Sequence, residues 1–448
     1  MRSIALASVL AVFLSFPFSS LAEPPQPNPQ QPTVQQAPSQ RTTTPLTPEQ
    51  QDTEARKKLE AEIAKELGQG GKKTGPAAQG QPAAVAQGTT GGSPTARLLL
   101  LPDISAIGSF AGAFDTYDVE NQSPREGPFG PKNKPTPLFE ELELGLQSVI
   151  DPYARADIFI SFTPEGVDVE EAYLTSLSLP GGLQIRAGKF FSPFGRLNQQ
   201  HPHVWDFIDA PLARGRILAV ETLSGPGVDV AWLAPLPWFT ELHLAGQGTA
   251  ELPNEDQGQG ERLTAIARLL QYFPIGESTT LGIGLSAARR SETTSGFRDV
   301  GGADLYLRWR PIHSRSYVTL QGEVYTRKFR GGGLSDELKA ALPTLASNVD
   351  HGSDTGGYAQ LFWRQDAYFG YGVRYDNAPT GPRFLGEEGA DAAAGTEHRY
   401  GAVATWFPSE FQRLRLQVSY DQRPGGKDGI EALLALEIGI GSHGAHPF

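Results

Sequence analysis

The sequence predicts an all-β fold, a closed antiparallel transmembrane β-barrel of about 16 strands, and three observations support this. From about residue 103 onward, stretches of roughly ten residues alternate small or apolar side chains with polar ones. Turn residues separate the stretches, and sixteen of them, an even number, are found. The connections between them alternate between short and long. This combination is typical of bacterial outer-membrane barrels.

The chain begins with a segment typical of a secretory signal peptide, residues 1–22. Arg2 supplies the positive charge, Ile4–Phe18 is mainly apolar, and Ser20–Ala22 is a small-residue cleavage site. The apolar part is shorter than the roughly 20 residues that a spanning helix needs. Since no long apolar run follows it, the rest of the sequence offers no helical route across a bilayer.

Residues 23–100 predict a disordered periplasmic linker, because their Pro, Gln, Gly, Thr and Ala cannot bury enough apolar surface to fold. Within it, residues 48–67 predict a short helix, introduced by a capping box at Thr47–Gln50. Its narrow apolar stripe consists of Leu59, Ile63 and Leu67. Two interpretations stay open: a solvated helix, or a short coiled coil that joins subunits.

Composition narrows the class of function. The chain has 51 glycines and no cysteine, and only 39% of its residues are hydrophobic. A barrel can be this polar because only alternate residues contact lipid. The formal net charge of −12 argues against a nucleic-acid partner. The sequence contains neither a Gly-x-Ser-x-Gly elbow nor a phosphate-binding loop, so we expect no enzyme activity and no cofactor.

Residues 101–448 form the predicted barrel, and its strands follow from the two-residue period of side-chain direction. The alternation is clearest in 153–163, 302–310 and 412–421, where apolar residues oppose arginine, aspartate and serine. The sixteen predicted strands span residues 103–116, 138–150, 153–163, 167–178, 183–191, 226–234, 239–250, 261–272, 279–290, 302–310, 316–329, 354–366, 369–377, 397–407, 412–421 and 430–441.

The connection lengths predict the orientation of the barrel. Connections after even-numbered strands are short, whereas most of those after odd-numbered strands are long, the longest being 191–225. Short turns of such barrels face the periplasm, so we expect both chain ends there. Aromatic residues gather near strand ends, where they predict either interfacial girdles or ordinary core packing: Phe190, Phe191, Trp238, Phe239, Tyr272, Phe273, Trp406 and Phe407.

Residues Arg186–Gly195 carry a family resemblance. Their Gly-Lys-Phe…Pro-Phe-Gly pattern ends a strand and opens a loop, and it resembles bacterial outer-membrane porins of the phosphate-selective porin O/P-like group. The final residue, Phe448, resembles the aromatic end by which barrel-assembly machinery recognises such proteins. The resemblance covers roughly 100–448 and implies a 16-stranded barrel, often trimeric, with a narrow basic channel.

The resemblance also implies that loop 191–225 folds inward and narrows the pore; a surface loop is the alternative. The charged residues expected at the constriction are Arg196, Asp206, Asp209, Arg214 and Arg216. By strand alternation, the expected pore-lining bases are Arg155, Arg186, Arg268, Arg308, Arg310, Arg327, Arg364, Arg399, Arg413 and Arg415, and the expected acids are Glu141, Glu143, Asp157, Glu171, Asp304, Glu323 and Glu437. The lumen is therefore mixed with a modest arginine excess, and phosphate specificity does not follow.

Two histidine pairs carry metal-ligand residue types. His201 and His203 lie near Asp206 and Asp209, and His443 and His446 lie near the end of the sequence. Imidazole and carboxylate suit zinc or another transition ion. The competing interpretation is that neither pair binds anything specific, because neither shows three convergent ligands on rigid elements.

Three functions are compatible with this sequence. The first is an outer-membrane channel for passive diffusion of small hydrophilic solutes, favouring anions and limited in size by loop 191–225. The second is a metal (zinc)-uptake receptor, but energy-coupled receptors have about 22 strands and a plug, for which residues 23–100 are too short and polar. The third is a non-conducting structural or adhesive barrel anchor. The expected partners are membrane lipid, solutes, the assembly machinery and identical subunits.

Overall fold

The computed structural model describes residues 102–116, 136–219, 222–249, 262–291, 297–330, 351–380, 395–425 and 428–441. All of these residues belong to one compact unit, Thr90–Phe448. The predicted signal peptide, the linker with its helix 48–67, the His443 and His446 pair and Phe448 lie outside the described residues. Within the described ranges, no helix has the length and apolar character needed to cross a membrane.

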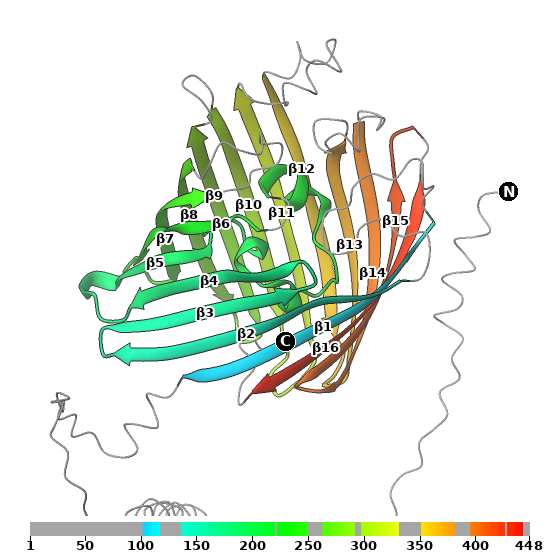
Figure 1. Cartoon of the computed structure of the whole chain (residues 1–448), viewed down its shortest axis with the longest axis horizontal. Helices are drawn as coiled ribbons and strands as arrows, with labels where there is room; N and C mark the ends of the chain where they lie inside the picture. Colours follow the sequence, from blue (N-terminus) through cyan, green and yellow to red (C-terminus); the bar gives the residue numbers. More distant parts are fainter. Residues whose placement is uncertain are drawn as a thin grey trace, which may run out of the picture. The chain divides into compact units, whose positions relative to one another are not determined.

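Sixteen antiparallel strands form a closed barrel, as the sequence predicts (Figure 1). Every predicted strand is confirmed, with ends shifted by no more than a few residues. The strands are β1 Asp103–Asp115, β2 Thr136–Asp151, β3 Ala154–Thr163, β4 Gly166–Ser176, β5 Leu183–Phe191, β6 Ser224–Leu233, β7 Phe239–Thr249, β8 Arg262–Ile275, β9 Thr279–Ser291, β10 Phe297–Trp309, β11 Tyr317–Arg330, β12 His351–Arg364, β13 Phe369–Thr380, β14 Gly395–Ser409, β15 Gln412–Gln422 and β16 Gly429–Gly441.

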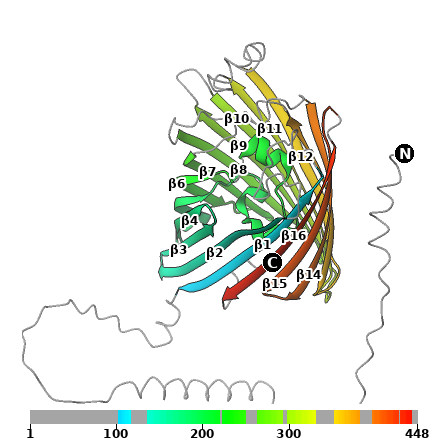
Figure 2. The same cartoon turned by 45° about the vertical axis from the view of Figure 1, so that its right-hand side comes forward.

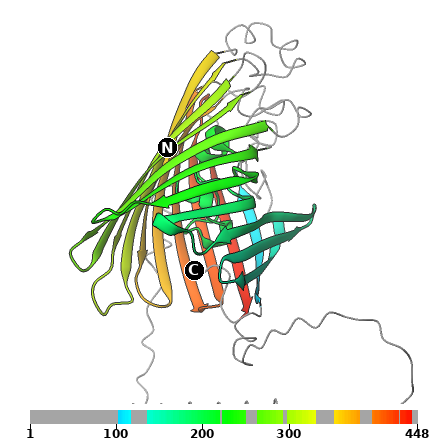
Figure 3. The same ribbon diagram turned by 90° about the vertical axis from the view of Figure 1, so that its left-hand side faces the viewer.

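The barrel closes where the first strand pairs with the last. The β1–β16 ladder runs from Ser105 opposite Gly441 to Asp115 opposite Glu431. Each remaining strand pairs with its neighbour in the sequence. Closure removes the unpaired strand edges that an open sheet would expose, and the strands tilt strongly, as a closed barrel requires (Figure 3).

The two faces of the wall differ as the alternation predicts. On β16, outward Leu434 and Ile440 are 48% and 66% exposed, whereas inward Glu437 is 1% exposed. Outward residues of the other strands repeat this pattern, with large exposed side chains such as Val373, Leu285 and Leu416. A soluble protein rarely exposes an apolar surface of this extent, so the outer face is suited to lipid.

Among the four register shifts found between paired strands, two are β-bulges in the same part of the wall, one between β1 and β2 and one between β3 and β4. Between β1 and β2, Ser109 pairs with Glu141 and Phe110 with Phe139, which leaves Glu140 as an extra residue. Between β3 and β4, Phe159 pairs with Glu171 and Ile160 with Val169, which leaves Glu170 extra. A bulge re-aims the side chains beside it, so the strict alternation fails at these two positions.

The connection between β5 and β6 folds into the barrel. It contains the short 3-10 helices η3 Leu197–Gln199 and η4 Pro202–Val204 and the π-helical turn η5 Arg214–Leu218. Figure 2 shows these turns inside the ring of strands. The apolar residues of the β5–β6 connection pack with inward residues of the wall, among them Tyr325 of β11 and Tyr358 of β12. A further 3-10 turn, η2 Pro180–Gly182, connects β4 to β5. We call residues 192–219 the inward loop.

The aromatic residues near strand ends divide between the two faces. Trp238 and Trp406 are exposed on the outside, in agreement with a girdle. Phe190, Phe191 and Phe407 are buried instead, so the girdle interpretation is wrong for them. They pack against interior groups; the Phe407 ring, for example, lies 3.3 Å from the Arg364 guanidinium.

Candidate channel interior

Asp209 fastens the inward loop to the far wall. Its carboxylate accepts hydrogen bonds from Arg374 of β13 at 2.5 Å, Arg399 of β14 at 2.7 Å and Gln417 of β15 at 2.6 Å. Burial by itself would raise the pKa of Asp209, but the two arginines outweigh it and hold the pKa below its usual value. The charged carboxylate is therefore a fixed part of the interior.

Two neighbouring arginines of β15 hold the backbone of the same loop. Arg413 donates to the carbonyl oxygens of Trp205 and His203, and Arg415 donates to those of Trp205 and Phe207. Both also pair with Glu437 of β16 at 2.5 Å. Charge-assisted hydrogen bonds of this kind are stronger than neutral ones, so they fix the path of the loop.

A single carboxylate, Glu323 of β11, anchors the beginning of the loop. It accepts the backbone N–H groups of Arg196 and Leu197 at 3.0 and 2.7 Å, and the hydroxyls of Tyr325 and Tyr358 at 3.0 and 2.8 Å. Asn198 then joins the two ends of the loop, because its side chain hydrogen-bonds the carbonyls of Ser192 and Leu223 and the Leu223 N–H.

The two loop arginines expected at the constriction are buried. Arg214 and Arg216 are 1% and 2% exposed. Arg216 pairs with Glu397 at 2.7 Å, and Arg214 donates to the hydroxyl of Thr222 at 2.7 Å. They stabilise the folded loop, and their side chains are not exposed to a solute.

Half of the predicted pore-lining arginines, Arg268, Arg327, Arg399, Arg413 and Arg415, are buried and paired with carboxylates. Arg268 pairs with Asp304 at 2.7 Å and Arg327 with Asp354 at 3.0 Å, and Arg399 also pairs with Asp421 at 2.7 Å. A paired, buried arginine contributes little net charge to a passing ion. The alternation identified the face of these residues but not their partners.

Three of the partly exposed interior arginines each lie against an aromatic ring. The Arg196 guanidinium lies 3.7 Å from the ring centre of Tyr306, Arg308 lies 4.6 Å from Tyr317, and Arg364 lies over Phe407. Tyr317 is within electrostatic range of both Arg308 and Arg364. We call Arg196, Arg308 and Arg364 the arginine cluster; cation–π contact holds such side chains in place while leaving the charge accessible.

Asp206 of the inward loop lies beside the arginine cluster. It accepts a hydrogen bond from Gln360 at 3.2 Å and is partly exposed. Burial raises its pKa above the usual value, and the charges of Arg413, Arg415 and Arg196 only partly oppose this. Mild acidification therefore neutralises Asp206 at a higher pH than Asp209, whose pKa is lowered.

The remaining predicted pore-lining residues have varied positions. Arg155 and Arg186 point inward with partial exposure and pair with Asp157 and Asp229 at 2.5 and 3.3 Å. Glu141 points inward and accepts from the Ser161 hydroxyl at 3.0 Å. Arg310 is a correction: β10 ends at Trp309, and Arg310 lies exposed in the following turn, where it donates to the Ser314 carbonyl.

The structure brings His201 and His203 to a group of glutamates. His201 Nδ1 lies 2.8 Å from Glu143 of β2 and 2.9 Å from Glu170 of β4, and its Nε2 lies 3.0 Å from Glu171. His203 Nδ1 lies 3.6 Å from the same Glu143 oxygen. Burial by itself would lower the pKa of His201, but hydrogen bonds to the three glutamates raise it well above its ordinary value. Asp206 and Asp209, the carboxylates nearest in sequence, have the other partners already described.

Sequence reasoning placed Glu143 and Glu171 inward but did not connect them with the histidines, and it missed Glu170. Strict alternation directs Glu170 outward, and only the bulge brings it to His201. The adjacent pair Glu170–Glu171 was the available signal, since two consecutive acids in a strand that alternates polar and apolar residues mark a break in the pattern.

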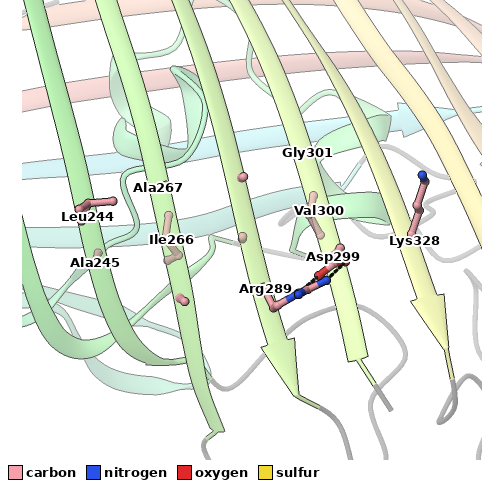
Figure 4. A pocket seen from close by; sticks show the side chains of 12 residues that line it. Leu244, Ala245, Ile266, Ala267, Arg289, Asp299, Val300, Gly301 and Lys328 are labelled. Carbon is pink, nitrogen blue, oxygen red and sulfur yellow. Dashed lines mark hydrogen bonds and ion pairs between the residues drawn. The ribbon is translucent and has the colours of Figure 1, made fainter. Parts of the chain in front are cut away.

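A shallow groove of about 730 Å³ lies on the outer face of β7–β11 (Figure 4). Small residues such as Ala267, Ala287 and Gly301 form its floor. At one end, Arg289 of β9 pairs with Asp299 of β10 at 2.6 Å. The groove faces away from the interior and is not part of the candidate channel.

No family model matches the chain, so the resemblance to the phosphate-selective porin O/P-like group is not confirmed. A protein of Aquifex aeolicus (strain VF5), described as an uncharacterized protein, is 30% identical over 334 residues, which cover 68% of this chain and 69% of the relative.

The structural comparison gives outer-membrane proteins. The outer membrane channel DcaP of Acinetobacter baumannii has a TM-score of 0.49 and 11% identity, covering 76% of this chain and 98% of its own. The anion-selective porin from Comamonas acidovorans has a TM-score of 0.48 and 10% identity, covering 76% and 99%. The barrel itself is established by the strand pairing of this chain.

Proposed function

The chain belongs to one family with the Aquifex aeolicus protein, and from its own fold we propose that it is an outer-membrane porin-like channel. It would admit small hydrophilic solutes by passive diffusion and favour anions. The observation that carries the proposal is the combination of an apolar outer face with a partly exposed arginine cluster inside a closed barrel.

The outer face supports location in a membrane. Only helices and closed barrels satisfy every backbone group inside lipid, and here the large apolar side chains are exposed on the outside while charges lie inside. The parity of long and short connections supports an orientation with both chain ends in the periplasm. Homotrimer assembly and recognition of Phe448 by barrel-assembly machinery stay predictions from the resemblance.

The interior supports a size limit and a charge preference. The inward loop occupies part of the cross-section and is held by Asp209, Glu323, Arg413 and Arg415. Arg196, Arg308 and Arg364 supply the accessible positive charge, and Asp206 is the acid next to them. Rings of charged side chains set the selectivity of pores, and three arginines against one carboxylate favour anions.

The buried Arg–carboxylate pairs favour a second candidate, a non-conducting barrel anchor. Pairs such as Arg268 with Asp304 and Arg374 with Asp376 occupy interior volume together with the inward loop. An interior closed in this way would leave the barrel as a membrane attachment for the N-terminal arm. The two candidates differ in one measurable property, conductance.

The test is single-channel recording of the refolded protein in a planar bilayer with a salt gradient. Stepwise conductance with a reversal potential of the anion-selective sign is expected. Circular dichroism and membrane fractionation of the same preparation verify folding and insertion. If folded and inserted protein shows no conductance, the channel proposal fails and the anchor is favoured. If it conducts with a reversal potential of the cation-selective sign, the protein is a channel but the proposed role of the arginine cluster is wrong.

A further inference from the structure

We propose that Glu143, Glu170 and His201 form a binding site for a divalent transition-metal cation, with His203 as an additional ligand. The site would clamp the inward loop to β2 and β4. The proposal concerns a resident cation and does not depend on whether the barrel conducts.

Three potential ligand atoms converge at this site. A carboxylate oxygen of Glu143, one of Glu170 and a ring nitrogen of His201 lie within 4.8 Å of one another. The three ligands come from two strands and the inward loop. Mixed nitrogen and oxygen donors suit Zn²⁺ and related ions, whereas Mg²⁺ and Ca²⁺ prefer oxygen alone.

The spacing fits a small cation after a minor adjustment. Ligands on a tetrahedral Zn²⁺ at 2.0–2.2 Å lie roughly 3.3–3.6 Å apart. His201 Nδ1 is 2.8 and 2.9 Å from the two glutamate oxygens, and His203 Nδ1 is 3.6 Å from the Glu143 oxygen. Moving the two glutamate oxygens roughly half an ångström from His201 Nδ1 brings these two distances to the value that the ion requires.

The other ring nitrogen of His201 faces a carboxylate. His201 Nε2 lies 3.0 Å from Glu171 Oε2, and the second oxygen of Glu171 accepts the Phe191 N–H at 2.8 Å. Metal-binding histidines characteristically donate their remaining N–H to a carboxylate, which fixes the tautomer. With Nε2 carrying its hydrogen toward Glu171, a cation would replace the proton on Nδ1 and bind between that nitrogen, Glu143 and Glu170.

The fold positions these groups specifically. The bulge on β4 adds Glu170 to the face that already carries Glu171, and β-bulges are frequent beside functional sites. The His201 ring is held between Phe159 and Phe191, with ring centres 5.0 and 4.5 Å away, and is stacked with His203 at 5.5 Å. Among these groups, four carboxylates including Glu141 face two imidazoles, so a divalent cation reduces the repulsion between the acids.

The test uses the full-length mature protein, refolded in detergent without a polyhistidine tag and stripped with EDTA. Isothermal titration with ZnCl₂ and metal analysis after gel filtration measure affinity and stoichiometry. The variants are His201→Gln and Glu170→Gln. His243→Gln is the matched control, because His243 also contacts two carboxylates, Asp229 and Glu241, but at opposite ring nitrogens. A second control replaces His443 and His446 together by alanine.

One Zn²⁺ per chain is expected, with affinity reduced at least tenfold in both site variants and unchanged in both controls. X-ray absorption at the zinc edge of the wild-type protein should show imidazole nitrogen and carboxylate oxygen, which keeps the test valid if His201→Gln does not fold. Absence of stoichiometric binding by folded wild-type protein overturns the proposal and leaves a protonated imidazole among glutamates. Binding that disappears only when His443 and His446 are replaced also overturns it.

Discussion

Asp209 of the inward loop and Arg399 of β14 lie 2.7 Å apart, although 190 residues separate them in the sequence. Arg374 approaches the same carboxylate from the neighbouring strand β13. The interior of this barrel is thus organised around charges that the loop brings to the wall. The predictions below separate the charges that fix the loop from those that face the lumen.

Replacing Asp209 by asparagine should loosen the loop. It leaves Arg374 and Arg399 without one shared counter-charge, and removing one partner of a buried ion pair typically costs about 3–5 kcal/mol. The melting temperature in detergent should fall and open-channel noise should rise. Asp206→Asn is the control, since the Asp206 side chain accepts a single described hydrogen bond, from Gln360. Equal melting temperatures for the two variants would contradict the anchoring role.

The stabilisation by Asp209 should also depend on pH. Its folded-state pKa is lowered, so its contribution is fully present above the unfolded pKa of about 3.9 and is lost as the pH falls through the lower folded value. The free energies of unfolding of the wild-type protein and of Asp209→Asn should therefore become equal at the lowest pH. A constant difference down to that limit would show that charge is not the cause.

Neutralising the arginine cluster should shift ion selectivity. Arg308→Gln and Arg364→Gln should each move the reversal potential toward the cation-selective sign, and the double variant should move it further. Arg310→Gln is the matched control, because Arg310 follows Arg308 by two residues but lies beyond the end of β10, exposed in the turn. A shift of the same size in the control would assign the selectivity to the general surface charge.

Acidification should increase the anion preference through Asp206. Because its pKa is raised above the usual value, this carboxyl becomes neutral at a higher pH than ordinary carboxyls, which titrate at about 4. The loss of its negative charge leaves the arginine cluster unopposed, so the reversal potential should become more anion-selective as the pH falls. At neutral pH, the Asp206→Asn variant should already have the reversal potential that the wild-type protein reaches at acidic pH. If that variant keeps the wild-type pH dependence, another group is responsible.

Gly195→Ala should disturb the loop more than a comparable change elsewhere. Gly195 has φ +60°, and a Cβ there would lie 2.2 Å from Glu323 Oε2. Gly276 has φ +62° but open space around it, so Gly276→Ala reports the backbone cost alone, about 1–2 kcal/mol. The melting temperature should fall further for Gly195→Ala, with altered conductance in that variant only. Matching losses would mean that the glutamate contact is not important.

The sequence alone determined the barrel. The side-chain period of a strand is two, so the alternation of apolar and polar residues along each strand shows which of its faces contacts lipid. Alternation placed Leu434 and Leu436 outside and Arg413 and Glu437 inside, and the structure agrees. The exceptions are local. Arg310 lies beyond the end of its strand, and the bulge at Glu170 breaks the period. The sequence marks only the bulge, through the consecutive acids Glu170 and Glu171.

The tertiary structure alone decided which inward charges remain accessible. Whether an arginine is paired depends on the residue opposite it on the next strand and on the inward loop, and both are set by register and loop path. Strand alternation predicts the same inward direction for Arg268 and Arg308. In the structure, however, Arg268 is 2% exposed beside Asp304, whereas Arg308 is partly exposed over Tyr317. The association of His201 with Glu143 and Glu170 arises in the same way, because residues from β2, β4 and the loop, distant in the sequence, meet only in the folded structure.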